Sequence, residues 1–296
     1  MNRLEQASQF MEANARVVER RRFEHLFRGG DPKEALAALA AHANADGGFG
    51  WALHPDLRSV SSQPVAAIHA LEVLEDVAPV TSPLAAGLCD WLGGVSLPDG
   101  ALPFALAGAA SSGSAPMWEE SDPSQPSLLI TAALAGAAHR VAQHDPAVAE
   151  HPWLARATEF CMRRIQAIDA APMAIVLRFA LQLLDALHGA HPDAGPQLER
   201  VGAFVPASGT VAVTGGAEGE SMRPLDFSPV PGRPLRAVLS AAVIASDLDR
   251  LAAQQAPDGG WDVDGHVYSP AAALEWRGDA TVRALKTLRQ NGRLGD

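Results

Sequence analysis

An Asp-Gly turn that recurs three times constrains the fold of this 296-residue chain more than any other feature of its sequence. The copies read NADGGFGW from Asn44, PDGALPF from Pro98 and QAPDGGW from Gln255, and each leads toward the start of a helix. Self-similarity of this kind is typical of repeat proteins, in which each unit packs against its neighbours. We therefore predict one domain over residues 1–296, with repeat turns near 44–51, 97–104 and 255–262.

Composition predicts that the repeated units are helical. Hydrophobic residues make up 48% of the chain and aromatic residues only 5%, so much of the apolar content is alanine. Alanine has the highest helix propensity, whereas the β-branched and aromatic runs that indicate strands are scarce. The predicted fold class is all-α, and the alternation of helices suggests outer and inner helix pairs that close into a ring.

Glycine, proline and capping residues mark the expected helix boundaries. Gly29-Gly30 ends a long first helix, and Asp31-Pro32 begins the next one. The expected helices cover 1–28, 32–43, 64–76, a stretch from Pro83, 126–142, 152–168, 173–188, 234–255 and 279–290. The remaining expectations are an extended piece at 201–213, a flexible acidic loop at 215–222 and a mobile insertion at 108–115 in the second repeat.

The net charge and the length of the apolar runs limit which partners and which cellular compartment are expected. A net charge of −11 argues against nucleic acid or an anionic membrane as a partner. No apolar run approaches the roughly 20 residues of a membrane span, and the N-terminus lacks the apolar region of a signal peptide. Cys89 and Cys161 lie in helical patterns and do not suggest a disulfide framework. We expect a soluble, cytoplasmic protein, and the sequence leaves its oligomeric state open.

One basic cluster stands out in the first helical stretch, at Arg16, Arg20, Arg21 and Arg22, with Arg28 beyond it. Our interpretation is a solvated outer helix face. An anion-binding patch is the alternative.

The turn residues resemble a known motif. The stretch Gln255–Trp261 fits Q-x-x-x-G-x-W, which is similar to the QW motif of squalene–hopene and oxidosqualene cyclases. The copy at 46–51 resembles a degenerate form, with Ala43 in place of Gln and Phe49 in place of Trp, and the second copy has Leu102 at the aromatic position. The β-subunits of protein prenyltransferases share this plan. The chain thus resembles the terpenoid-cyclase and protein-prenyltransferase superfamily, and the resemblance implies an α/α toroid whose inner-helix N-termini gather at one mouth.

The chemical motifs of these families are missing or altered. Class II terpene cyclases protonate an alkene with D-x-D-D, and the nearest match here, Asp262-Val263-Asp264-Gly265, lacks the last aspartate and is interpreted as turn capping. Protein prenyltransferases hold zinc with Asp-x-Cys and a distant histidine, whereas Glu159-Phe160-Cys161 has glutamate and falls within a predicted helix. We expect no metal and no cofactor.

The candidate site lies in the segments between each turn and the following helix. Tryptophans and polar side chains gather there, and aromatic walls with a few convergent carboxylates fit a small-molecule pocket. The adjacent Glu119 and Glu120 carboxylates would raise each other's pKa and supply a general acid. The predicted catalytic residues are Glu119, Glu120, Asp56 and Glu275. The predicted substrate-binding residues are Trp51, His54, Gln63, Trp118, Gln125, Asp226, Trp276 and Arg277. Asp226 lies in residues 224–227, which we interpret as a degenerate fourth copy of the segment between turn and helix.

Each of these residues also has a structural alternative. The alternatives are helix capping for Asp122 and Asp279, backbone hydrogen bonding for Gln63 and Gln125, and pairing of Arg58 and Arg277 with Asp56 and Glu275.

The leading functional hypothesis is a terpene-cyclase-like enzyme that binds a small apolar or isoprenoid-like substrate in a central cavity and acts by acid–base chemistry. Low aromatic content argues against carbocation cyclisation, because such cations are held by π-faces. The alternatives are a non-catalytic binding or scaffold toroid and an (α/α)-barrel enzyme acting on sugars. The sequence thus leaves open whether the protein is an enzyme.

The predicted positions of the candidate residues relative to the helix N-termini indicate which of them matter most for function. We expect function to depend on Glu119, Glu120, Glu275, Arg277 and Asp56 more than on Asp262 or Asp264. The first group is predicted to lie just before inner-helix N-termini, where the helix dipoles favour carboxylates. Arg277 would bind an anionic substrate group, and the insertion before Glu119 would fold over the opening as a lid.

Overall fold

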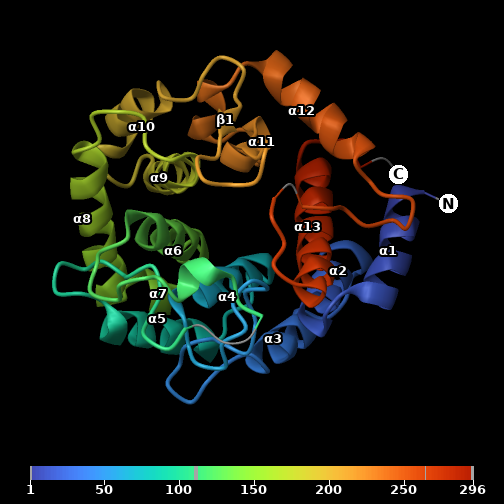
Figure 1. Ribbon diagram of the computed structural model, residues 1–296, viewed down its shortest axis with the longest axis horizontal. Helices are drawn as coiled ribbons and strands as arrows, with labels where there is room; N and C mark the ends of the chain where they lie inside the picture. The colour runs from blue at the N-terminus through green and yellow to red at the C-terminus, as the bar shows by residue number, and fades with distance from the viewer. Residues whose placement is uncertain (1, 110–112, 264, 295–296) are drawn as a thin grey trace. The chain divides into compact units, whose positions relative to one another are not determined.

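The computed structural model describes residues 2–109, 113–263 and 265–294, and the chain divides into two compact units (Figure 1). Unit 1 combines Met1–Gly29 with Ala170–Asp296, whereas unit 2 is Gly30–Asp169. Unit 1 therefore joins the two ends of the chain, and unit 2 is the continuous segment between them. The units are described one at a time.

Unit 2 is built around α6 (Leu128–Val141), in which ten of the 14 residues are buried. Its alanine-rich surface lets the neighbouring helices approach closely, and α6 packs against α4 (Pro64–Asp76) and α8 (Pro152–Gln166). The other elements of unit 2 are α3 (Pro32–Ala40), α5 (Pro83–Val95), the 3-10 helix η1 (Pro116–Trp118) and α7 (Pro146–Ala149).

Unit 1 is organised around the 21-residue helix α13 (Pro270–Gln290). This helix packs against α1 (Arg3–Asn14), α2 (Val17–Arg28) and α12 (Ala241–Ala253), so that the red and blue ends of the chain lie together in Figure 1. The other elements of unit 1 are α9 (Ala174–Leu187), α10 (Ala194–Gly202), β1 (Val211–Ala212), β2 (Ser221–Met222), α11 (Pro224–Phe227) and the 3-10 helix η2 (Pro234–Val238).

The predicted all-α class is confirmed. In the described part of the chain the only sheet is the antiparallel pair of β1 and β2, with Val211 opposite Met222. Among the described helices, none combines the length and the apolar content that crossing a membrane requires.

Several predicted helix boundaries are also confirmed. Gly29 ends α2 with a φ of +72°, a conformation that costs glycine little. The Asp31 carboxylate accepts the backbone N–H of Lys33 at 2.9 Å, which caps α3 with Pro32 at its first position. The helix predicted at 64–76 is α4, with the same bounds.

The prediction of one helix over 1–28 is wrong. α1 and α2 meet at Ala15 and Arg16, whose ψ angles of 152° and 162° are extended. Gly278 of α13 lies against this break, because a Cβ on Gly278 would be only 3.1 Å from the Cβ of Ala15. Packing against α13 therefore sets a boundary for which the local sequence carries no glycine or proline signal.

Two later helices also differ from their prediction. The stretch predicted as a helix over 234–255 contains η2 and then α12, and the Ser240 hydroxyl caps α12 by accepting the N–H of Val243 at 3.3 Å. The helix predicted at 279–290 begins at Pro270, where the Ser269 hydroxyl accepts the N–H of Ala272 at 3.1 Å. This Ser-Pro start adds more than two turns to the N-terminus of α13.

The region 201–222 is less extended than predicted. Val201 and Gly202 complete α10, and within the stretch 201–213 that was predicted to be extended only Val211–Ala212 forms a strand. The predicted acidic loop leads into β2 and is tied back to β1 by a hydrogen bond from the N–H of Val213 to the carbonyl of Glu220, at 2.9 Å.

The three repeat turns share one hydrogen-bonding pattern. In each turn the aspartate carboxylate accepts the backbone N–H two residues later, and the glycine between them has a positive φ. The pairs are Asp46 with Gly48 at 2.9 Å, Asp99 with Ala101 at 3.1 Å and Asp258 with Gly260 at 3.1 Å. The φ angles of Gly47, Gly100 and Gly259 are +89°, +90° and +94°.

Each of these glycines also touches the backbone of a helix in its own unit. A Cβ on Gly47, Gly100 or Gly259 would be 2.6, 2.6 or 2.1 Å from the carbonyl oxygen of Gly87, Arg156 or Gln6, respectively. Real Cβ atoms do not approach so closely, so glycine is required for both space and φ. The first, second and third turns therefore pack closely against the backbones of α5, α8 and α1, respectively.

The second glycine of the turn has a different role from the first. Gly48 and Gly260 do not have positive φ angles. A Cβ on Gly48 would lie 2.5 Å from the Cβ of Ser62, and one on Gly260 would lie 2.8 Å from the ring of Phe10. Close packing therefore requires glycine there.

Candidate functional site

Two loops of unit 2, at 51–63 and 103–118, are hydrogen-bonded to each other. The N–H of Ala115 donates to the carbonyl of Asp56 at 2.8 Å, and the N–H of Arg58 donates to the Ser114 hydroxyl at 2.9 Å. The insertion predicted at 108–115 is therefore anchored on the first loop at its C-terminal end. Residues 110–112 lie outside the described part of the chain.

Gln63 joins these loops from the start of α4. Its Oε1 accepts the backbone N–H of Leu106 at 2.9 Å, and its side chain makes no cap hydrogen bond with α4. This confirms the structural alternative for Gln63, which satisfies a backbone donor.

An aromatic cluster forms where the two loops meet α4. Phe104 stacks on Trp118 with ring centroids 4.7 Å apart, and His54 meets the Trp118 ring edge-on at 5.3 Å. His54 also lies 5.2 Å from His69 of α4, with the rings inclined by 62°. Trp118 is only 5% exposed, and its indole N–H has no acceptor among the described residues. The cluster thus brings two imidazoles against a buried π-surface.

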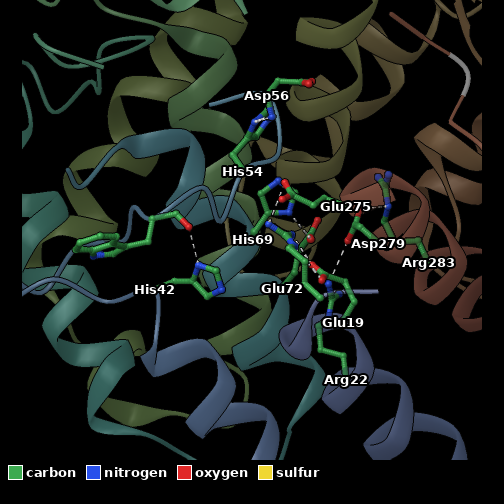
Figure 2. A network of polar contacts seen from close by, with 12 residues as sticks. Glu19, Arg22, His42, His54, Asp56, His69, Glu72, Glu275, Asp279 and Arg283 are labelled. Atoms are coloured by element: carbon green, nitrogen blue, oxygen red, sulfur yellow. Dashed lines mark hydrogen bonds and ion pairs between the residues drawn. The ribbon is translucent and has the colours of Figure 1, made fainter. Parts of the chain in front are cut away.

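A backbone N–H contacts one ring nitrogen of His54, and a carboxylate lies beside one ring nitrogen of His69. The N–H of Asp56 donates to Nδ1 of His54 at 3.2 Å, so in the neutral ring the proton is on Nε2. Nδ1 of His69 lies 3.4 Å from Oε2 of Glu72, one helical turn further along α4 (Figure 2). The site therefore pairs an imidazole held by a backbone N–H with a second imidazole beside a carboxylate.

Trp51 lies at the base of the first loop, and its side chain is 52% exposed. Its indole N–H donates to Oδ1 of Asn44 at 2.8 Å. Its carbonyl accepts from Nδ1 of His42 at 3.0 Å, a contact drawn in Figure 2. Unlike His54 and Trp118, Trp51 faces solvent.

The predicted placement of Glu119 and Glu120 before a helix N-terminus is wrong. They follow η1, and α6 begins at Leu128 with Ser127 as its cap. Both carboxylates and the Gln125 side chain are exposed. The extra loop length of the second repeat separates these residues from the helix start.

Asp122 is likewise not the cap of α6. Its carboxylate accepts the N–H and the hydroxyl of Ser124, at 2.8 and 2.7 Å, within an exposed turn. The Ser124 hydroxyl lowers the pKa of this carboxyl group. Gln125 adds a longer contact to the same carboxylate, at 3.4 Å.

Glu275, Trp276 and Arg277 of unit 1 lie inside α13, so their predicted placement before the helix is also wrong. Arg277 holds the third repeat turn: it contacts Asp258 at 2.7 Å and Asp262 at 2.6 Å. Its guanidinium also lies 4.5 Å from the centre of the Phe10 ring. The hydrogen bond from Arg277 lowers the pKa of Asp258.

Asp262 is thus part of the turn, and Asp264 lies outside the described residues. Asp226 has a structural position as well. Its carboxylate accepts the N–H of Arg223 at 2.7 Å and its carbonyl accepts from Gln182 at 2.9 Å, which fixes the four-residue helix α11.

A buried ionic network connects α2 with α13 (Figure 2). Arg22 contacts Asp279 at 3.1 Å, and these side chains are 4% and 1% exposed. Arg283 contacts the other Asp279 oxygen at 2.8 Å. The interpretation of the arginine cluster as a solvated face is therefore wrong for Arg22. The capping alternative for Asp279 is wrong too, because this residue lies in the helix interior.

The same network extends to the break between α1 and α2. Arg16 binds both carboxylate oxygens of Glu19, at 2.5 and 3.0 Å, and lies 3.8 Å from Glu275. Burial raises the pKa of Glu19, and Arg16 offsets only part of this effect. Burial alone would lower the pKa of Arg16, but the carboxylates of Glu19, Glu275 and Asp279 together outweigh it and the pKa is raised.

Cys89 and Cys161 are free and buried, and burial raises the pKa of Cys89 to about 12.

Sequence reasoning missed His69, Glu72 and Phe104. The available signal was the spacing of His69 and Glu72, which lie one turn apart on a correctly predicted helix. Neither the protein-family models nor the curated proteins compared with this chain give a match.

Proposed function

We propose that the cluster of His54, His69, Phe104 and Trp118 is a small-molecule site that performs acid–base chemistry on an apolar or isoprenoid-like substrate. The observation that carries this proposal is the pair of adjacent imidazoles, one of them beside the Glu72 carboxylate, against a buried aromatic surface. In this proposal His69 accepts a proton and His54 donates one.

The surroundings suit this chemistry. The Glu72 carboxylate lies beside the His69 ring, one helical turn away on the same helix. The stacked rings of Phe104 and Trp118 offer a π-face to a substrate that gains positive charge. Asp56 contributes by its backbone, because its N–H fixes the tautomer of His54.

The earlier carboxylate candidates take secondary places in this proposal. Glu119 and Glu120 directly follow Trp118 and remain candidates for a polar rim of the same site. Glu275 belongs to the ionic network of unit 1, and we propose a structural role for it there.

We further propose that the repeat turns belong to an α/α toroid of the terpenoid-cyclase type. The support is the shared geometry of the three turns together with the sequence resemblance. The alternatives are a non-catalytic scaffold and a sugar-active (α/α) barrel. Measured turnover of any substrate would exclude the non-catalytic scaffold.

Deuterium incorporation tests the acid–base proposal. Farnesol and squalene are incubated with the protein in D2O, and products and recovered substrate are analysed by mass spectrometry. We expect protein-dependent deuterium at carbon, reduced about 10²-fold or more in His69→Gln, because general acid–base groups contribute that much. Met117→Ala, an exposed apolar change next to Trp118, is the matched control and should retain the activity.

Failure of both substrates to gain deuterium would remove the proposed enzyme and favour the scaffold. Equal activity in wild type and His69→Gln would instead show that the chemistry is elsewhere.

A further inference from the structure

Trp51 and its neighbour Ala52 have an unusual backbone. Their φ angles are +51° and +54°, and they are the non-glycine residues with positive φ in the described part of the chain. Residues with side chains adopt this conformation at a cost, and it persists where the surroundings hold it. Here the strained pair turns a large indole toward solvent, an arrangement that burial alone would not favour.

Polar contacts tie the Trp51 indole to the backbone of the segment 60–62. Asn44 accepts the Trp51 indole N–H and also donates to the carbonyl of Val60 and the hydroxyl of Ser62, both at 3.0 Å. Gly50 packs tightly against the backbone of the same segment, because a Cβ on Gly50 would be 2.5 Å from the carbonyl oxygen of Val60. Asn44 therefore links the Trp51 indole to the backbone of Val60, whose side chain is 58% exposed.

These contacts decide what Trp51 can recognise. Its N–H is already donated to Asn44, so its remaining free feature is the face of the ring. The nearby side chains are hydroxyls and an amide, including an exposed Ser61 whose Oγ lies 2.8 Å from that of Ser59. An aromatic face attracts polarised C–H groups, and a hydroxyl-bearing rim suits a ligand with many hydroxyls.

We propose that Trp51 is a stacking platform for a pyranose ring of an oligosaccharide. The C–H face of the sugar covers the indole and Val60, while its hydroxyl groups bind Ser61 and Asn44. Two apolar side chains fall far short of the roughly 800 Å² that each partner buries in a stable protein interface, which disfavours a protein partner. This inference goes beyond the proposed function, because it concerns another face of the loop and another class of ligand.

Saturation-transfer NMR tests this platform. Cellotetraose, maltotetraose and chitotetraose are titrated against the whole protein, and we expect at least one to bind saturably through its C–H protons. Trp51→Gly should weaken that binding about tenfold or more, because the stacking surface is lost. Glycine adopts the native φ without strain, so the fold should survive. Trp51→Phe should retain part of the binding, since it keeps an aromatic face, and Met117→Ala should retain all of it.

Three results would overturn the proposal. One is that none of the three sugars binds. Another is that Trp51→Gly binds as well as wild type while its thermal melting is unchanged. The last is that binding disappears in His54→Ala but persists in Trp51→Gly, which would assign the sugar to the His54 site. The first two results do not bear on deuterium incorporation, so the two proposals can fail separately.

Discussion

Replacing Gly259 with alanine tests the physical account of the repeat turn. The φ of Gly259 is +94°, and the new Cβ would be 2.1 Å from the carbonyl oxygen of Gln6 in α1. Positive φ costs an alanine about 1–2 kcal/mol. The overlap, about 1 Å inside normal contact, forces the turn and α1 apart, and such overpacking costs about 1–3 kcal/mol. We therefore expect a loss of about 2–5 kcal/mol in the free energy of unfolding.

The matched control is Gly29→Ala at the end of α2. Gly29 has a φ of +72°, but no atom lies within 4 Å of a Cβ built there. This change carries the backbone strain without the clash, so we expect a loss of about 1–2 kcal/mol. Urea unfolding followed by circular dichroism measures both variants. If Gly259→Ala costs no more than Gly29→Ala, close approach to α1 does not explain this glycine.

Two further predictions concern charged pairs of unit 1. Arg22→Met should lower the free energy of unfolding by about 3–5 kcal/mol, because it removes a partner of the buried Asp279 carboxylate. The double variant Arg22→Met with Asp279→Leu should be less destabilised than Arg22→Met alone in urea unfolding. A larger loss in the double variant would contradict this. The lowered pKa of Asp258 means that its pairing with Arg277 stabilises the fold above about pH 4 and that this contribution is lost as the pH falls through the folded-state value. Arg277→Met should therefore show a smaller loss of stability between pH 7 and pH 3 than wild type, in unfolding curves at both values, and an unchanged loss would contradict the assignment.

Local signals predicted much of the fold. The Asp-Gly turns, the Asp31-Pro32 start and the Gly29 cap each depend on residues that are adjacent in sequence, and all appear as expected. The start of α13 was also readable, since Ser269-Pro270 is a capping signal. Because the helix was predicted to begin at 279, Glu275 and Arg277 were wrongly predicted to lie before it.

Other features depend on contacts between distant segments. The break at Ala15 and Arg16 arises where Gly278 of α13 packs against the chain, and no residue near the break announces it. The arginine stripe looked solvated because its partner Asp279 comes from the far end of the sequence. Local patterns cannot supply such partners.

The candidate site was predicted in part for the same reason. His54 and Trp118 were recognised as members of loops that follow turns, and they do meet. His69 was missed because its partners are brought to it by the docking of 103–118 on 51–63. Neighbouring residues in sequence gave no indication of that docking.

The indole NMR spectrum tests the central claim, that the His54–Trp118 cluster binds a small molecule. The chain has six tryptophans, and Trp118 and Trp153 are both buried with indole N–H groups that lack an acceptor among the described residues. The ¹H–¹⁵N spectrum is recorded during titration with farnesol, with the two signals assigned from Trp118→Phe and Trp153→Phe. We predict a saturable shift of the Trp118 signal while the Trp153 signal stays in place. A stationary Trp118 signal, or equal shifts of both, would contradict the site.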